Sequence, residues 1–332
     1  MVVQNWIEVI QTANLSREKE MDIVSRWLII TRAAVFSMTL TSGAIGGLLA
    51  AAAGSFEWTP FILAMVGLVL AHAANNMIND YFDLTGGVDT NEYYRAQYAP
   101  HPILAGLISK SGLRNAIILV NAIDAAIAVY LVSVRGWPVL LFAGLGLFIS
   151  VFYVAPPIRL KHIGLGELGV FLVWGPLMIG GTYYVASATI TPSVFAACLP
   201  YALLVTTVLI GKHLDKFEQD KAKGIHTLPV LLGYDVSIRL NQALMITFYV
   251  VTLALVAAHM IGVWVLLVVF SLPRLVRVLK IYSEPKPTSA PKNFPVWPLW
   301  YVAAAFYLNK LSGGLFILGL ILNLLLPNRL PF

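Results

Sequence analysis

The chain has 332 residues, of which 59% are hydrophobic and only 11% are charged. Soluble domains carry about 25% charged residues, so this composition argues against a water-soluble enzyme and excludes a disordered chain. The single cysteine excludes an intramolecular disulfide. The net charge of +6 comes from few residues. We therefore interpret it as a charge bias of membrane loops rather than as a nucleic-acid surface.

The N-terminal segment, residues 1–26, is predicted to form an amphipathic helix at the membrane surface. Apolar residues such as Trp6 and Ile10 are followed by a polar, charged stretch, which is typical of helices that lie in the interface. The segment is too polar to contain the apolar core of a signal peptide. We expect residues 27–332 to form a single membrane domain.

Beyond this segment, apolar runs long enough to cross a bilayer, about 20 residues, recur along the whole chain. The runs are unbroken, so they predict helices rather than the alternating strands of a barrel. The last run can also be divided into two shorter pieces near Asn309. The fold class is therefore an all-α polytopic bundle of about nine transmembrane helices around a central apolar cavity. The nine predicted spans cover residues 28–53, 60–80, 115–134, 138–156, 167–187, 194–212, 242–260, 261–282 and 299–326.

The basic residues are unevenly divided between the two sides of such a bundle. With nine spans, 19 of the 22 lysines and arginines lie near the N-terminus or in and beside the loops that follow spans 2, 4, 6 and 8. These parts share one side of the membrane, and the positive-inside rule places that side in the cytoplasm. We predict a multi-pass protein of the cytoplasmic membrane, with its N-terminus and its acidic loops in the cytoplasm.

The first acidic cluster follows span 2 and contains Asp80, Asp83 and Asp89. If the helix of span 2 continues, Asn76, Asp80 and Asp83 share one face. A pair of glycines then breaks the helix, and the returning chain can bring Asp89 to the other carboxylates. Carboxylate and amide oxygens suit Mg²⁺, which in turn suits a diphosphate. A solvated acidic loop explains the cluster less well, because carboxylates near lipid are costly and usually functional.

The second acidic cluster follows span 6 and interleaves acids with lysines over residues 212–224. Asp215 and Glu218 share a helical face, and Asp220 lies two residues further on. Because lysine offers phosphate oxygens a point charge, this composition favours a site that holds metal and phosphate together. A helix end with ordinary salt bridges is the competing interpretation of this segment alone. The presence of the first cluster favours the functional interpretation.

These motifs resemble those of the UbiA superfamily of intramembrane prenyltransferases, which are bundles of nine transmembrane helices with two aspartate-rich loops. The first family motif, N-D-x-x-D followed by a third Asp, matches Asn79, Asp80, Asp83 and Asp89. The G-x-D setting of the third Asp is similar to the menaquinone branch, 1,4-dihydroxy-2-naphthoate prenyltransferase. Two further stretches resemble the same branch: residues 101–109 and 164–184.

The resemblance implies Mg²⁺-dependent transfer of a polyprenyl group from its diphosphate to an aromatic quinone precursor, with 1,4-dihydroxy-2-naphthoate as the expected acceptor. Two Mg²⁺ ions are expected to bridge the diphosphate and to neutralise the departing charge. The partners are expected to be these substrates and membrane lipid, with no nucleic acid and no partner protein. The expected catalytic residues are Asp80, Asp83 and Asp220. The expected metal ligands are Asn76, Asp80, Asp83, Asp89, Asp215, Glu218 and Asp220. The residues expected to bind the diphosphate are Arg32, Arg95, Lys161, Lys212, Lys221 and Lys223. Those expected to contact the acceptor or the prenyl cation are Asn79, Tyr153 and Glu167.

The chain departs from the family pattern at two positions. Lys216 stands where the second motif usually has its first Asp, and His101 replaces a usual Arg. Asp215 is adjacent to Lys216, but one residue turns a helical side chain by about 100°. Either the segment is irregular there, or Glu218 takes over as the ligand.

Two other functions remain open from the sequence. A UbiA-type enzyme with another acceptor, such as 4-hydroxybenzoate, a tetrapyrrole or an ether lipid, would use the same motifs. A membrane transporter is the alternative from a different class. Transporters usually place charged or interrupted helices near the midplane, whereas here that region has only Asp124 and Lys310.

Overall fold

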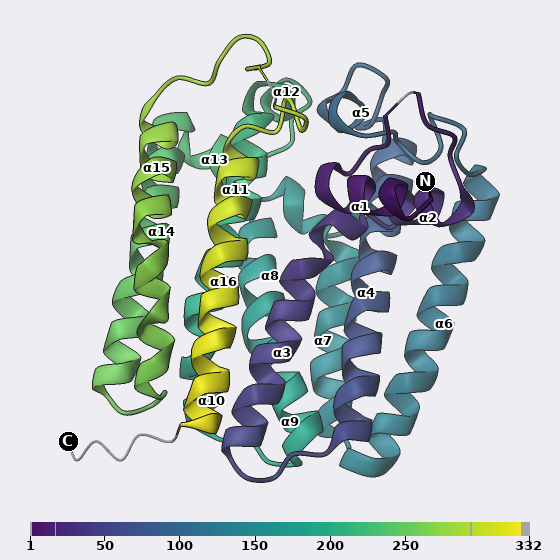
Figure 1. The fold of residues 1–332 in the computed structure, drawn as a ribbon. Helices are drawn as coiled ribbons and strands as arrows, with labels where there is room; N and C mark the ends of the chain where they lie inside the picture. The colour runs from purple at the N-terminus through teal and green to yellow at the C-terminus, as the bar shows by residue number, and fades with distance from the viewer. Residues whose placement is uncertain (1, 17, 293, 327–332) are drawn as a thin grey trace.

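The computed structural model describes residues 2–16, 18–292 and 294–326. In these residues the elements are helices, and the β pairing is limited to one isolated bridge between Ile163 and His226. Long helices run side by side through a single bundle (Figure 1). The predicted all-α membrane bundle is confirmed.

Seven helical segments among the described residues are long and apolar enough to cross a membrane. α8 (Gly166–Leu172), the π-helix η3 (Val173–Gly180) and α9 (Gly181–Ser187) together form one of them, and α10 (Pro192–Ala197) with α11 (Leu199–Asp215) forms another. The seven segments are Ala33–Ala52, which contains η1 (Ala33–Val35) and α3 (Phe36–Ala52), α4 (Trp58–Thr85), α6 (Lys110–Arg135), Gly166–Ser187, Pro192–Asp215, α14 (Tyr234–Ala257) and α16 (Tyr301–Leu325).

The two remaining predicted spans are helical but shorter or differently wound. The fourth contains α7 (Pro138–Phe152), and the eighth contains the 3₁₀-helix η4 (Val263–Ser271) followed by α15 (Leu272–Ser283). The number nine is therefore not confirmed as a count of long α-helices, although each predicted span falls on a helical segment. The last span is one helix and is not divided near Asn309.

Two helix contacts depend on glycine, because the backbones approach too closely for a side chain. A Cβ at Gly46 of α3 would lie 2.5 Å from the carbonyl oxygen of Ile179 in η3. A Cβ at Gly319 of α16 would lie 2.5 Å from the carbonyl oxygen of Trp264 in η4. Such contacts are typical of membrane helices, which associate through close packing of small residues.

The N-terminal segment folds onto one end of the bundle (Figure 1). α1 (Val2–Thr12) packs against α2 (Ile23–Ile30) through a cluster that includes Val9 and Ile29. Asp22 caps α2 by accepting hydrogen bonds from two backbone amides of its first turn. The placement of this segment at a membrane surface stays a prediction. The exposed large apolar side chains of its described residues up to position 26 are Val2, Val3, Ile7, Ile10, Ile23 and Val24.

The same end of the bundle carries the loops that follow α4 and α11 (Figure 1). α4 ends at Thr85, and Gly87 then adopts a left-handed backbone with φ of +73°. The amides of Val88 and Asp89 donate to the carbonyl oxygen of Asp83 at 2.8 and 3.0 Å. The predicted helix break and chain reversal are thus confirmed, and they return Asp89 to the end of α4. The short helices of these loops are α5 (Tyr94–Tyr98), α12 (Phe217–Ala222) and α13 (Leu228–Leu232).

Candidate active site

Asp80 lies in the penultimate turn of α4 and has no exposed surface. Arg32 donates a hydrogen bond to its Oδ1 atom, and the Arg95 Nε atom donates to the same oxygen at 3.1 Å. Arg32 itself has a left-handed backbone with φ of +54° between α2 and η1. This backbone conformation is uncommon for a residue with a side chain and concentrates at functional sites. The negative charge of Asp80 is therefore balanced by two guanidinium groups from separate segments.

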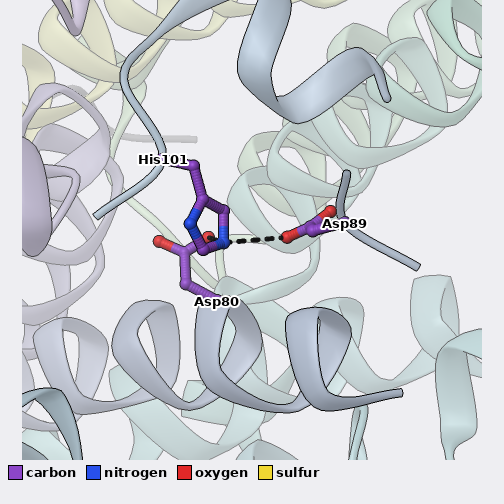
Figure 2. Close-up of side chains that lie close together, drawn as sticks. All are labelled: Asp80, Asp89 and His101. Carbon is purple, nitrogen blue, oxygen red and sulfur yellow. Dashed lines mark ion pairs between the residues drawn. The ribbon is translucent and has the colours of Figure 1, made fainter. Parts of the chain in front are cut away.

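His101 joins Asp80 and Asp89 in a compact buried cluster, shown in Figure 2. Its Nε2 atom lies 3.3 Å from the Asp89 Oδ2 atom and 3.9 Å from the Asp80 Oδ1 atom. Its Nδ1 atom accepts hydrogen bonds from the amides of Ile103 and Leu104, both at 3.3 Å. An acceptor at Nδ1 assigns the ring proton to Nε2. The Nε2 atom makes no hydrogen bond among the described residues, so His101 lies close to both carboxylates without donating to either.

Asp83 follows one turn after Asp80 and meets a cation from a different loop. The Lys161 Nζ atom donates to both oxygens of the Asp83 carboxylate, at 2.7 and 2.6 Å. Lys161 lies in η2 (Leu160–His162), after α7, and is itself buried. This contact attaches the loop after the fourth span to the first acidic motif.

In the second motif, Asp220 is the buried carboxylate that faces the first motif. It accepts a hydrogen bond from the Tyr93 hydroxyl at 2.5 Å, and the Lys216 Nζ atom lies 3.0 Å from both of its oxygens. Burial alone would raise the pKa of Asp220, but the charges of Lys216 and His213 and the hydrogen bonds that Asp220 accepts together lower it. Burial would likewise lower the pKa of Lys216, but Asp220 and the nearby tyrosines together raise it well above its usual value. Both groups are therefore charged at neutral pH.

Further contacts tie the two acidic loops to each other. The Tyr94 amide donates to the Gln219 Oε1 atom at 2.7 Å. The Lys223 Nζ atom donates to the carbonyl oxygen of Val88 at 2.5 Å and lies 4.9 Å from the centre of the Tyr93 ring. The two motifs, distant in sequence, thus form one site at the end of the bundle.

Three residues of the second motif that were expected in the site have other surroundings. Asp215 accepts hydrogen bonds from Lys286 at 3.0 Å and from the amides of Tyr301 and Val302 at 3.1 and 3.0 Å. It therefore satisfies amides at the start of α16, as capping carboxylates do. Glu218 and Lys221 are exposed on α12. α11 ends at Asp215 and α12 begins at Phe217, so the segment is irregular at Lys216, and Lys216 lines the pocket while Asp215 faces the start of α16.

Below the charged residues lies an apolar cavity of about 1000 Å³ between the helices. Its walls come mainly from α4, α6, α7, η3, α11 and α16, which confirms the predicted central cavity. A smaller, polar pocket containing Asp83, Asp89 and Lys216 adjoins it. The expected site residues that line both spaces are Arg32, Asn79, Arg95, Tyr153 and Lys212.

The remaining expected residues lie near this junction. Asn76 lines the large cavity and donates to the carbonyl oxygen of Thr31 at 2.9 Å. The Asn79 Oδ1 atom is buried and has no hydrogen-bond partner among the described residues. Glu167, in α8, is buried and lies 2.5 Å from the His213 Nδ1 atom.

Sequence reasoning did not select three residues that complete the site. Tyr93 and His101 contact the acidic motifs because the loop after α4 folds back over them. The spacing of residues in the sequence does not predict this fold of the loop. Lys216, like His101, stands out in the sequence only as a departure from the family pattern, and its pairing with Asp220 follows from their separation of four residues.

Relatives with assigned names are similar to most of this chain. It is 25% identical over 265 residues to the 2-carboxy-1,4-naphthoquinone phytyltransferase of Synechocystis sp., covering 76% of this chain and 81% of the relative. It is 22% identical over 268 residues to the 1,4-dihydroxy-2-naphthoate octaprenyltransferase of Bacillus subtilis, covering 79% of this chain and 81% of the relative.

Solved structures share the fold at lower sequence identity. A UbiA homolog from Archaeoglobus fulgidus bound to GPP and Mg²⁺ has a TM-score of 0.60 and 15% identity, covering 88% of this chain and 99% of its own. The apo structure of a UbiA homolog from Aeropyrum pernix K1 has a TM-score of 0.64 and 19% identity, covering 86% and 97%. The model of the UbiA prenyltransferase family matches residues 40–309. The chain therefore belongs to the UbiA prenyltransferase family and is an integral membrane enzyme that transfers prenyl groups.

Proposed function

We propose that this enzyme transfers a polyprenyl group from polyprenyl diphosphate to 1,4-dihydroxy-2-naphthoate, with Mg²⁺, in the cytoplasmic membrane. The observation that carries the proposal is the junction of a charged pocket with an apolar cavity of about 1000 Å³. A diphosphate head with a long apolar tail matches the two spaces in polarity. The polar pocket has a free volume of only about 30 Å³, so the head would also extend into the charged end of the large cavity. Arg32, Arg95 and Lys212 line both spaces and are placed to meet the head where the tail begins.

The first acidic motif fits a divalent cation by the chemistry of its donor atoms. Asp80, Asp89 and His101 each offer an atom within 4.8 Å of the others, and all three are buried. The buried Asn79 Oδ1 atom adds a neutral oxygen that has no partner in the described residues. Mg²⁺ prefers oxygen ligands, so we assign Asp80, Asp83 and Asp89 to the ion. A bound Mg²⁺ supplies charge stabilisation to the departing diphosphate.

The chain's own residues perform the other tasks of the reaction. Lys161 and Lys212 are placed to bind phosphate oxygens as the bond between the allylic carbon and the diphosphate oxygen breaks. The apolar walls below exclude water from the allylic cation. The aromatic face of Tyr153, at the junction of the two spaces, is suited to stabilise that cation.

The proposed acceptor follows from the sequence resemblance and from the names of the relatives, which include a naphthoate prenyltransferase and a naphthoquinone phytyltransferase. Asn79 and Tyr153 line the junction, and the buried Glu167–His213 pair lies close to Tyr153 in space. We place the acceptor ring beside these groups. The ring carbon that carries the carboxylate attacks the allylic carbon and the diphosphate leaves. The carboxylate then leaves as carbon dioxide, and the electron pair of the broken carbon–carbon bond restores the aromatic ring.

The experiment is a transfer assay with purified protein in lipid. It combines a polyprenyl diphosphate, Mg²⁺ and a panel of aromatic acceptors, and the products are identified by mass spectrometry. A decarboxylated prenyl naphthoquinol that disappears with EDTA supports the proposal. A product formed only with another acceptor would overturn the assignment of naphthoate, while no product from folded protein with any acceptor would overturn the proposed reaction.

A further inference from the structure

This inference concerns the second acidic motif and rests on the proposed function. Among the described residues, none of the carboxylates of this motif lines the pocket: Asp220 is completely buried, Asp215 binds backbone amides of α16, and Glu218 is exposed. Within the described residues, the one group of three possible ligands, Asp80, Asp89 and His101, comes from the first motif. A metal ion binds through several ligands that its site brings together. The second motif does not offer such a set.

Asp220, the remaining carboxylate of the second motif, is paired with the ammonium group of Lys216. The Lys216 Nζ atom lies 3.0 Å from both oxygens of Asp220, and both side chains are almost completely buried. The Tyr93 hydroxyl donates to Asp220 at 2.5 Å and lies 3.3 Å from the Lys216 Nζ atom. The ammonium group therefore has fixed partners, and it stands at the position where the family motif usually has its first Asp.

Lys216 also faces the space in which we place the diphosphate. It lines the small polar pocket together with Asp83 and Asp89 of the first motif. Five basic side chains line this pocket, so the protein itself supplies much of the positive charge that a diphosphate needs. The basic residues that line the pocket are Arg32, Arg95, Lys161, Lys212 and Lys216.

We propose that the Lys216 ammonium takes the place of a second metal ion. The enzyme then binds its diphosphate substrate with one divalent cation at the first motif and with Lys216 at the second. Asp220 and Tyr93 are positioning residues that hold the ammonium toward the pocket. A chelator removes the divalent cation at the first motif and leaves the positive charge of Lys216 in place.

The test measures metal stoichiometry directly. Purified wild-type protein is mixed with Mn²⁺ and a non-cleavable thio analogue of a prenyl diphosphate, and bound Mn²⁺ is counted by electron paramagnetic resonance and equilibrium dialysis. We expect one Mn²⁺ per chain when the analogue is saturating. Two Mn²⁺ per chain with bound analogue would overturn the inference and leave the proposed function intact. Failure of the analogue to bind at all would overturn the proposed function instead.

Two variants of Lys216 give opposite expected results. Lys216→Asp creates a pair of carboxylates four helical positions apart and is expected to raise the stoichiometry to two Mn²⁺ per chain. Lys216→Met keeps the length of the side chain and removes the charge, so it is expected to keep one Mn²⁺ while the analogue binds at least about tenfold more weakly. The matched control is Lys221→Met, an exposed lysine of the same segment. Analogue affinity unchanged in folded Lys216→Met would also overturn the inference.

Discussion

The Tyr93 hydroxyl lies 2.5 Å from the Asp220 Oδ1 atom, although the two residues are 127 positions apart. This hydrogen bond joins the two acidic loops directly across the head of the cavity. Its donor comes from the loop after α4 and its acceptor from the loop after α11. The positions of the two motifs are therefore coupled, and a change in one loop is transmitted to the other.

The first prediction concerns this bond. Tyr93→Phe removes only the hydroxyl group and leaves Asp220 with Lys216 alone. Hydrogen bonds to charged groups contribute about 1.5–3 kcal/mol, so we expect kcat/KM for prenyl transfer to fall by roughly tenfold or more. Steady-state kinetics in lipid measures the change. Tyr130→Phe, on the exposed surface of α6, is the control. Unchanged kinetics in Tyr93→Phe would show that the bond does not support the site.

The second prediction concerns the charge balance around Asp80. Asp80→Asn leaves Arg32 and Arg95 facing a neutral amide in a buried setting. Breaking a buried ion pair by removing one partner costs about 3–5 kcal/mol. We expect prenyl transfer to be lost and the thermal unfolding temperature to fall. Glu218→Gln, which changes an exposed acid, should leave both unaltered.

An Asp80→Asn variant with full thermal stability would contradict the structural part of this prediction. An active variant would contradict the assignment of Asp80 to the metal site. The two outcomes are independent because stability is measured without substrate or added metal, whereas transfer requires both.

A third prediction tests the packing of the bundle. Gly46→Ala would place a methyl group 2.5 Å from the backbone carbonyl oxygen of Ile179, and this neighbour cannot move aside as a side chain could. Overpacking of this kind costs about 1–3 kcal/mol, so we expect a lower unfolding temperature. Gly144→Ala in α7 has open space around it and should be neutral or stabilising, by up to about 1 kcal/mol. Equal effects of the two substitutions would refute the close helix contact.

Local sequence signals predicted the parts of the site that depend on local geometry. The glycine pair after α4 predicted the chain reversal that returns Asp89, because only a left-handed residue allows so sharp a turn there. At the second motif, the 100° rotation between neighbouring helical positions left two possibilities open, an irregular segment or a ligand role for Glu218, with Asp215 still among the expected ligands. The structure shows the irregular segment, because the helix is interrupted between Asp215 and Phe217 and Lys216 lines the pocket.

Local sequence signals could not predict the contacts between residues that are far apart in the sequence. Tyr93 and His101 contact the carboxylates because the loop after α4 folds back over them. The spacing of residues along the sequence does not predict this loop conformation. The helix type of the apolar segments was not predictable either. A run of apolar residues does not distinguish an α-helix from the 3₁₀-helix at Val263–Ser271. Hydropathy therefore located the predicted spans but did not determine their helical type.

The last prediction concerns orientation in the membrane, which we propose from the bias of basic residues toward one side. The native Cys198 is buried, so an added cysteine can be labelled with little background. Glu218→Cys places a thiol on exposed α12 at the end that carries the acidic loops, and Ser55→Cys places one in the exposed loop between α3 and α4. In intact cells, a membrane-impermeant maleimide should label position 55 and leave position 218 unlabelled. In inside-out vesicles the pattern should reverse, because the cytoplasmic face is then outside. Labelling of position 218 in intact cells would invert the proposed topology without affecting the site itself.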